Sequence, residues 1–183
     1  MSDEITYLIE FVLRPGSDSS ARMDFLAAAI SHDVHLERVE VGEDGRGVVV
    51  YTDPPVTPEE RATLMRWLHG HALVHTYAER VAPVAGLVYE FTSEAAPVQA
   101  EGTLAGHEMY FRARWDEWSF AVSEHADVDP SAIDSPEAAD ARGWFRGGSF
   151  QEPYAGSRLP TADADSIIRI CAREYLYDHT PSN

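Results

Sequence analysis

Lysine is absent from this sequence, and all 14 basic residues are arginines. Without a lysine amine, a Gly-Lys-Ser/Thr phosphate-binding loop and Schiff-base chemistry are both excluded. Asparagine occurs only as the terminal Asn183. Because Lys and Asn codons are rich in A and T, this composition is typical of a GC-rich bacterium or of a virus that infects one. Protection from lysine-directed tagging and adaptation to high salt are two further explanations.

Cysteine and long apolar runs are also scarce. The single Cys171 cannot form an internal disulfide, which indicates a reducing compartment. The segment MSDEITYLIEF lacks the basic stretch and long apolar run of a signal peptide. No window approaches the ~20 apolar residues that a membrane-spanning helix needs. The sequence therefore predicts a cytoplasmic protein.

What the chain has in excess is negative charge. It carries 31 acidic residues against 14 arginines, for a formal charge of −17, and both halves contribute. Such a surface repels phosphate backbones and anionic lipids, so direct binding to nucleic acid or membranes is not expected. Basic proteins and cations are the partners that this charge favours. The content of 44% hydrophobic residues argues against a disordered chain.

Residues 1–92 predict a ferredoxin-like α+β unit, because strand, helix, hairpin, helix and strand follow one another in the order of a split βαβ arrangement. Its central signal is the Asp44-Gly45 pair between two apolar runs, which predicts a hairpin. The expected elements are a strand at Ile5–Leu13, a helix from Ser19 or Ser20 to Ser31, strands at Leu36–Val41 and Gly47–Thr52, a helix opened at Thr57, a segment Ala72–Val81 that suits helix or strand, and a strand at Leu87–Thr92.

Both helices of this unit carry local signals. In the first, Met23, Leu26 and Ile30 recur at helical spacing and predict the buried face. In the second, Thr57-Pro58-Glu59-Glu60 has the N-cap, the first-turn proline and the third-position glutamate of a capping box.

Residues 100–183 predict an antiparallel β-meander with a C-terminal helix, either as a separate domain or packed as one domain with the first. A linker is expected at Ser93–Gln99. The expected strands are Glu101–Leu104, Glu108–Trp115 and Trp118–Ser123. The segment Glu124–Asp140 suits a solvated or poorly ordered loop, and Gly143–Gly156 is too loose for a long helix. Thr161 and Asp163 are the expected caps of a last helix that runs to about Tyr177, and its apolar stripe consists of Ala164, Ile167, Cys171 and Tyr175.

The most distinctive segment combines arginines with aromatic residues. A period of two places Tyr110, Arg112 and Arg114 on one strand face and Met109, Phe111, Ala113 and Trp115 on the other. Arginine with aromatics recognises anions, carboxylates or an interface partner, so we expect a binding surface formed by Tyr110, Arg112, Arg114, Trp115, Trp118, Trp144 and Arg146. The alternative is that the arginines form ion pairs with Glu101, Glu108 or Glu124 and the tryptophans are core.

Histidines supply a second, weaker set of candidates. His69, His71 and His75 have spacings compatible with a metal site, as do His32 and His35, but no Cys pair or zinc-protease motif supports one. The metal prediction is therefore none, with helix-end and surface histidines as the simpler explanation. No cofactor motif is present, so no cofactor is expected.

Nucleophilic catalysis finds no support either. Cys171 falls on an apolar stripe, which predicts a buried thiol, and Ser149 lacks the flanking glycine of a nucleophile elbow. We therefore expect a non-enzymatic, acidic binding or regulatory protein that engages a basic protein surface, of the inhibitor, immunity or counter-defence type. Two alternatives stay open: a small-molecule or metal-dependent enzyme or ligand-binding domain with a His/Arg cleft, and a structural subunit of a phage or bacterial assembly.

Overall fold

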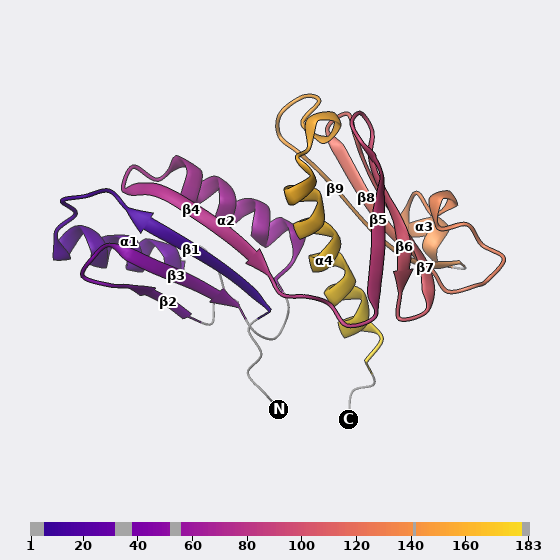
Figure 1. Ribbon diagram of the computed structural model, residues 1–183, viewed down its shortest axis with the longest axis horizontal. Helices are drawn as coiled ribbons and strands as arrows, with labels where there is room; N and C mark the ends of the chain where they lie inside the picture. The colour runs from indigo at the N-terminus through magenta and orange to yellow at the C-terminus, as the bar shows by residue number, and fades with distance from the viewer. Residues whose placement is uncertain (1–5, 32–37, 52–55, 141, 181–183) are drawn as a thin grey trace. The chain divides into compact units, whose positions relative to one another are not determined.

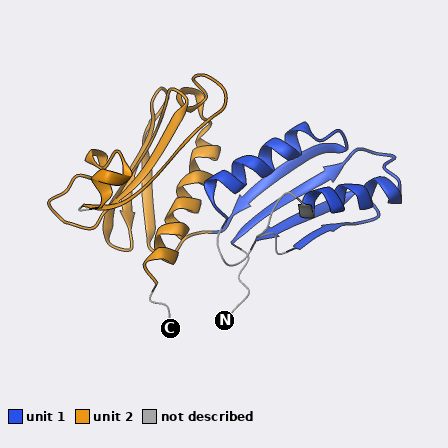
Figure 2. Ribbon diagram, turned by 180° about the vertical axis from the view of Figure 1, so that it is seen from behind, with its two compact units in different colours: residues 1–82 blue, residues 83–183 orange. Residues whose placement is uncertain are grey.

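The computed structural model describes residues 6–31, 38–51, 56–140 and 142–180, and it has an α+β architecture with two antiparallel sheets (Figure 1). The chain divides into two compact units, Met1–Ala82 and Pro83–Asn183 (Figure 2). The predicted fold class, an N-terminal split βαβ unit followed by a β-meander and a C-terminal helix, is confirmed.

The first unit is a four-stranded antiparallel sheet with the strand order β2-β3-β1-β4. Gly45, with φ of +78°, occupies the turn of the β2–β3 hairpin, as its Asp-Gly pair predicts. The elements in chain order are β1 Tyr7–Leu13, α1 Ser19–Ser31, β2 Arg38–Val41, β3 Arg46–Tyr51, α2 Pro58–Gly70 and β4 Val74–Val81.

The core of this unit lies between the sheet and its helices. Alternate residues of β1 are buried because the strand exposes only one face to the helices. Among the residues of α1 whose burial is described, Phe25 and Ala29 are buried, whereas Met23 is 63% exposed. The prediction is therefore wrong for Met23, while Leu26 is half-buried and the side chain of Ile30 lies outside the described residues; the ring of Phe25 packs between Phe11 and Trp67 and sets the helix rotation.

Helix α2 begins as its sequence predicts. The Thr57 hydroxyl accepts from the Glu60 amide, and the Glu60 carboxylate accepts from the Thr57 amide at 2.7 Å. These two bonds satisfy backbone donors that no helical carbonyl can reach.

Replacing Thr57 by alanine should lower the free energy of unfolding by about 1 kcal/mol, because one amide at the start of α2 loses its acceptor. Urea unfolding of Thr57→Ala and Thr57→Ser measures the effect. Serine retains the hydroxyl, so a loss of similar size in Thr57→Ser would contradict the capping explanation.

The second unit is a five-stranded meander, in which every strand pairs antiparallel with its neighbour in the chain, β5-β6-β7-β8-β9. The three predicted strands are β6, β7 and β8. The elements are β5 Leu87–Glu94, β6 Val98–Leu104, β7 His107–Arg114, β8 Glu117–Ser123, the 3-10 turn η1 Pro130–Ala132, α3 Pro136–Ala139, β9 Gly143–Ser149, the 3-10 turn η2 Gly156–Arg158 and α4 Thr161–Asp178.

The division between the units differs from the sequence-based boundaries. The strand predicted at Leu87–Thr92 lies in β5 and pairs with β6, so it does not close the first sheet; β4, from the ambiguous segment Ala72–Val81, does that. The predicted linker Ser93–Gln99 is the tight connection between β5 and β6 together with the strand ends that flank it. A connection this short pairs the two strands that it joins.

Strand β9 was not predicted, because three of its seven residues are glycines, which are rare in strands. Gly148 has a packing reason for its missing side chain: a Cβ there would lie 2.7 Å from the indole ring of Trp118. The glycine-rich stretch therefore continues the sheet and leaves room for a large aromatic side chain of β8.

Helix α4 covers one face of the five-stranded sheet (Figure 1). Its predicted stripe is confirmed, since Ala164, Ile167, Cys171 and Tyr175 are all buried. The predicted caps are wrong: the N-cap is Pro160, which offers no side-chain acceptor. No helix within the described ranges combines the length and apolarity needed to cross a membrane.

Candidate functional site

The alternation in β7 separates two faces of the second sheet. Met109, Phe111 and Ala113 are buried in the core beneath α4. The face opposite α4, here called the outer face, therefore carries Arg112 and Arg114. This placement agrees with the period of two in the sequence.

A pocket of about 620 Å³ opens on the outer face, and four of the seven predicted binding residues line it. We call it the outer pocket. Strand β7, the following turn and β8 contribute Arg112, Arg114, Trp115, Trp118 and Ser119; the loop after β8 contributes Asp134; and β9 contributes Phe145, Gly147, Gly148 and Ser149, with Glu117 completing the wall.

Arg112 is the least compensated charge in this pocket. It is half-buried, and its Nε is shielded from solvent and has no hydrogen-bond partner. Neither Arg112 nor Arg114 forms an ion pair within the part of the chain that the structure describes. By contrast, Arg146 and Arg169 both pair with carboxylates.

The predicted ion pairs of these arginines with Glu101, Glu108 and Glu124 are therefore not formed, and for Arg112 the strand register explains why; Arg114 lies opposite Glu117. Gln99 and Ser119 are the register partners of Arg112, whereas Glu101 lies opposite Tyr110. Glu124 instead contacts His179, at 2.7 Å between Oε1 and Nε2. With a neutral neighbour on each side, Arg112 has no cross-strand ion-pair partner.

Trp115 was predicted to share the apolar face, and this is wrong. It lies in the β7–β8 turn, 50% exposed, and its ring centroid is 5.7 Å from that of Tyr154, which is 56% exposed. Both residues adopt positive φ, +58° for Trp115 and +63° for Tyr154, a conformation that bulky side chains rarely adopt. Strain at exposed residues is characteristic of functional sites.

The neighbouring loop holds this turn in place. The Trp115 amide donates to the Ser157 hydroxyl at 2.7 Å, and the Ser157 amide donates to the Trp115 carbonyl at 3.1 Å. The guanidinium carbon of Arg114 lies 5.0 Å from the Trp115 ring centroid, which is a cation–π contact. The exposed aromatic pair is thus fixed beside the outer pocket.

The remaining predicted residues do not join the pocket. Tyr110 accepts a hydrogen bond from the Gln99 side chain. Trp144 contacts the ring of Tyr175 and donates to Asp178 at 3.0 Å, and Arg146 pairs with Glu174 at 3.3 Å, so both face α4. The sequence could not separate them from Arg112 because β9 was not recognised as a strand.

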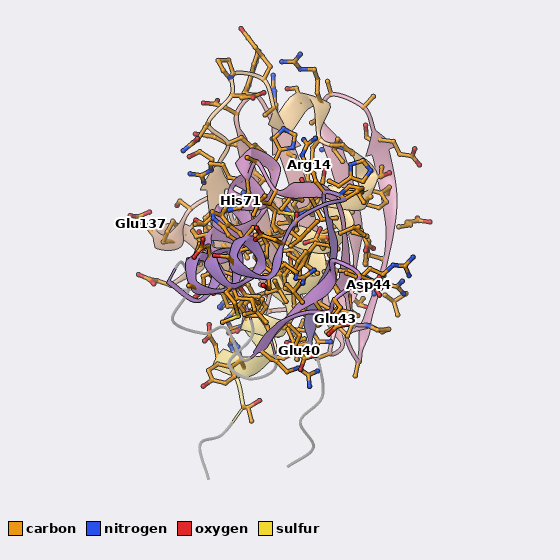
Figure 3. All side chains as sticks on the ribbon, turned by 90° about the vertical axis from the view of Figure 1, so that its left-hand side faces the viewer. Arg14, Glu40, Glu43, Asp44, His71 and Glu137 are labelled. Carbon is orange, nitrogen blue, oxygen red and sulfur yellow. The ribbon has the colours of Figure 1, made fainter. Side chains whose placement is uncertain are left out.

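The acidic segment Glu124–Asp140, here called the acidic loop, is more ordered than predicted. Ile133 is 2% exposed and Pro130 is also buried, so the middle of the loop packs on the sheet. Its acids are exposed, and Glu137 projects outward from the ribbon (Figure 3). The Asp129 carboxylate accepts from the Ser131 amide at 2.8 Å, and hydrogen bonding to Ser131 lowers its pKa.

Four carboxylates of the acidic loop lack such an internal role. Apart from those of Glu124 and Asp129, its carboxylates form no hydrogen bond or ion pair with any described residue. These four are Asp127, Asp134, Glu137 and Asp140. Asp134 also lines the outer pocket, so the acidic loop borders it.

The histidine candidates do not assemble. Helix α2 ends at Gly70, so His71 and His75 are not one helical turn apart. His71 packs against Phe25 and Trp67, with centroid distances of 4.9 Å and 5.1 Å, while His69 and His75 are exposed. Among the described residues no three His, Cys, Asp or Glu side chains gather as metal ligands. His32 and His35 lie outside the described residues.

The sequence-based site lacked Asp134, Phe145, Ser149 and Tyr154. Asp134 and Tyr154 come from loops, whose path over a sheet has no periodic signal, and the other two belong to the unpredicted strand β9.

Comparison with protein families, curated proteins and solved structures finds no match for this chain. Its function is therefore argued from the geometry of the site.

Proposed function

We propose that this chain is a non-enzymatic binding or regulatory protein whose outer face engages a basic surface of another protein, as an inhibitor, immunity or counter-defence protein does. The observation that carries the proposal is the set of four carboxylates on an ordered loop that have no partner among the described residues. One of them, Asp134, lines the same pocket as Trp115, whose ring contacts that of Tyr154.

Electrostatics favours this assignment. Exposed carboxylates on one loop of a chain of net charge −17 repel each other, and a basic partner relieves that repulsion. Because the acids do not converge as a metal-ligand group in the described ranges, the complementary shape is an extended basic surface. A nucleic acid is disfavoured, since its phosphates meet the same field.

The exposed aromatic pair supports a protein partner. Tryptophan, tyrosine and arginine are the residues that dominate the binding energy of interfaces, and here they stand together at one pocket. The Trp115 ring already accommodates the guanidinium of Arg114, so cationic side chains suit it. The proposal includes a cytoplasmic location, which the single buried thiol of Cys171 supports.

Neutralising the acidic loop tests the proposal. The variant Asp127→Asn/Asp134→Asn/Glu137→Gln/Asp140→Asn removes four charges, so the formal charge changes from −17 to −13 (−17 + 4). A matched variant removes four exposed charges elsewhere: Asp24→Asn/Glu43→Gln/Glu90→Gln/Glu94→Gln. Basic proteins captured from a lysate by the unaltered chain are identified, purified and titrated against all three proteins by calorimetry.

We expect the loop variant to bind such a partner about tenfold more weakly, or ~1.4 kcal/mol, and the matched variant to bind nearly as well as the unaltered chain. Equal losses in both variants would show a general charge attraction without a site, and the proposal would be wrong. The same holds if no basic protein is captured at moderate salt.

A further inference from the structure

We infer that the outer pocket is a site for a carboxylate carried on an apolar group, with Arg112 as its principal ligand. This goes beyond the proposed function, because a carboxylate can fill the pocket whether or not a basic partner contacts the acidic loop. The inference rests on the charge balance, the strand register and the lining of the pocket, in that order.

The charge balance is unusual for this chain. The sequence offers 31 acidic side chains, yet Arg112 and Arg114 lie two residues apart on one strand face without an ion pair among the described residues. Arg112 is half-buried, and one of its nitrogens is shielded from water without an acceptor. A guanidinium that is neither paired nor fully hydrated gains from binding an anion.

The register keeps that guanidinium available. Its cross-strand neighbours are Gln99 and Ser119, neither of which can supply a negative charge. Ser119 also lines the pocket, so a hydroxyl stands beside Arg112 as a second hydrogen-bonding group for an anion. A single residue of register shift would turn Arg112 to the opposite face.

The anion is a carboxylate rather than a phosphate. Asp134 and Glu117 also line the pocket, and the whole chain is strongly negative, so a dianion meets more repulsion than a planar group with one charge. The planar guanidinium suits the planar, bidentate geometry of a carboxylate. Trp115 and Phe145 supply aromatic walls, so the carboxylate is attached to an apolar group.

Two sources can present this chemistry: a free aromatic acid, and a peptide chain that ends in an apolar residue. Benzoate represents the first source and N-acetylphenylalanine the second, with benzamide and N-acetylphenylalaninamide as uncharged counterparts. Inorganic phosphate is the competing anion. Each compound is titrated into the ¹⁵N-labelled full chain at constant ionic strength, and the arginine Nε–H and tryptophan indole N–H signals are recorded.

We expect at least one carboxylate to shift the Arg112, Trp115 and Trp118 signals saturably, while Trp67 in the first unit stays unchanged. The acid that binds more tightly identifies the source. The amides and phosphate should leave these signals in place. Saturation by an amide or by phosphate at the same concentration, or the absence of any carboxylate effect, would overturn the inference.

Variants separate this site from general charge. Arg112→Met should weaken carboxylate binding about tenfold, and Arg112→Lys should also weaken it, because lysine retains the charge but loses the planar fork. Arg66→Met removes an exposed arginine of α2 and should have no effect. The acidic-loop variant keeps both pocket arginines, so it should bind carboxylate at least as well; unchanged binding by Arg112→Met would overturn the inference.

Discussion

Replacing Arg61 by methionine should lower the free energy of unfolding by about 3 kcal/mol, because the change leaves the Glu79 carboxylate, only 13% exposed, without its cation. Arg61 is 7% exposed and binds Glu79 through two parallel bonds, Nε to Oε1 at 2.6 Å and a terminal nitrogen to Oε2 at 2.7 Å. Urea unfolding followed by circular dichroism measures the loss.

The Tyr7 hydroxyl completes this network, since it donates to Glu79 Oε1 at 2.5 Å. Burial, and then the charge of Glu79, raise the pKa of Tyr7, so the phenol remains a donor. Buried ion pairs contribute little net stability, but a pair with one partner removed is costly. The network is therefore expected to show strong coupling between its members.

A double variant tests that coupling. Arg61→Met/Glu79→Met removes both charges and should recover most of the loss, to within about 1–2 kcal/mol of the unaltered chain. Arg66→Met, on the exposed side of the same helix, should change stability by less than about 0.5 kcal/mol. If the double variant is as unstable as the sum of both single variants, the two residues are not coupled.

Replacing Phe111 by alanine should cost about 3–5 kcal/mol, from lost burial and the cavity that remains. Phe111 is 0% exposed at the centre of β7 and lies opposite Phe120 in the adjacent strand. Chemical unfolding monitored by the fluorescence of the second unit's three tryptophans measures this loss: Trp115, Trp118 and Trp144.

The same variant checks the assignment of the two faces of β7. Glu108→Ala changes an exposed side chain of that strand and should cost less than about 0.5 kcal/mol. Phe111→Leu keeps most of the apolar volume and should lie between the two. A small loss for Phe111→Ala would contradict the burial of this face and, with it, the placement of Arg112 on the outer face.

The features that the sequence predicts are those that depend on neighbours in the chain. The Asp44-Gly45 turn, the capping box at Thr57 and the apolar stripe of α4 each follow from local geometry. The alternation in β7 likewise separates Arg112 from Phe111 with no knowledge of the rest of the fold. These local signals are enough to predict the fold class and to predict β7, the strand that carries Arg112 and Arg114.

Three of the errors have one cause in common, which is packing between segments distant in the chain. Whether Leu87–Thr92 joined the first sheet depended on which strand was free to pair with β1. The rotation of α1 depended on the contact of Phe25 with Phe11 and Trp67. Trp115 left the apolar face because the turn, held by Ser157, interrupts the strand period.

Composition alone determines the negative charge and excludes lysine chemistry, because both depend only on residue identities. The two-residue repeat of a strand adds that β7 separates arginines from apolar residues. Only the tertiary structure decided that Arg112 forms no ion pair among the described residues, that Asp134 and Trp115 border one pocket, and that Arg146 faces α4. Strand register and loop paths decide such proximities, and both result from the packing of the whole unit.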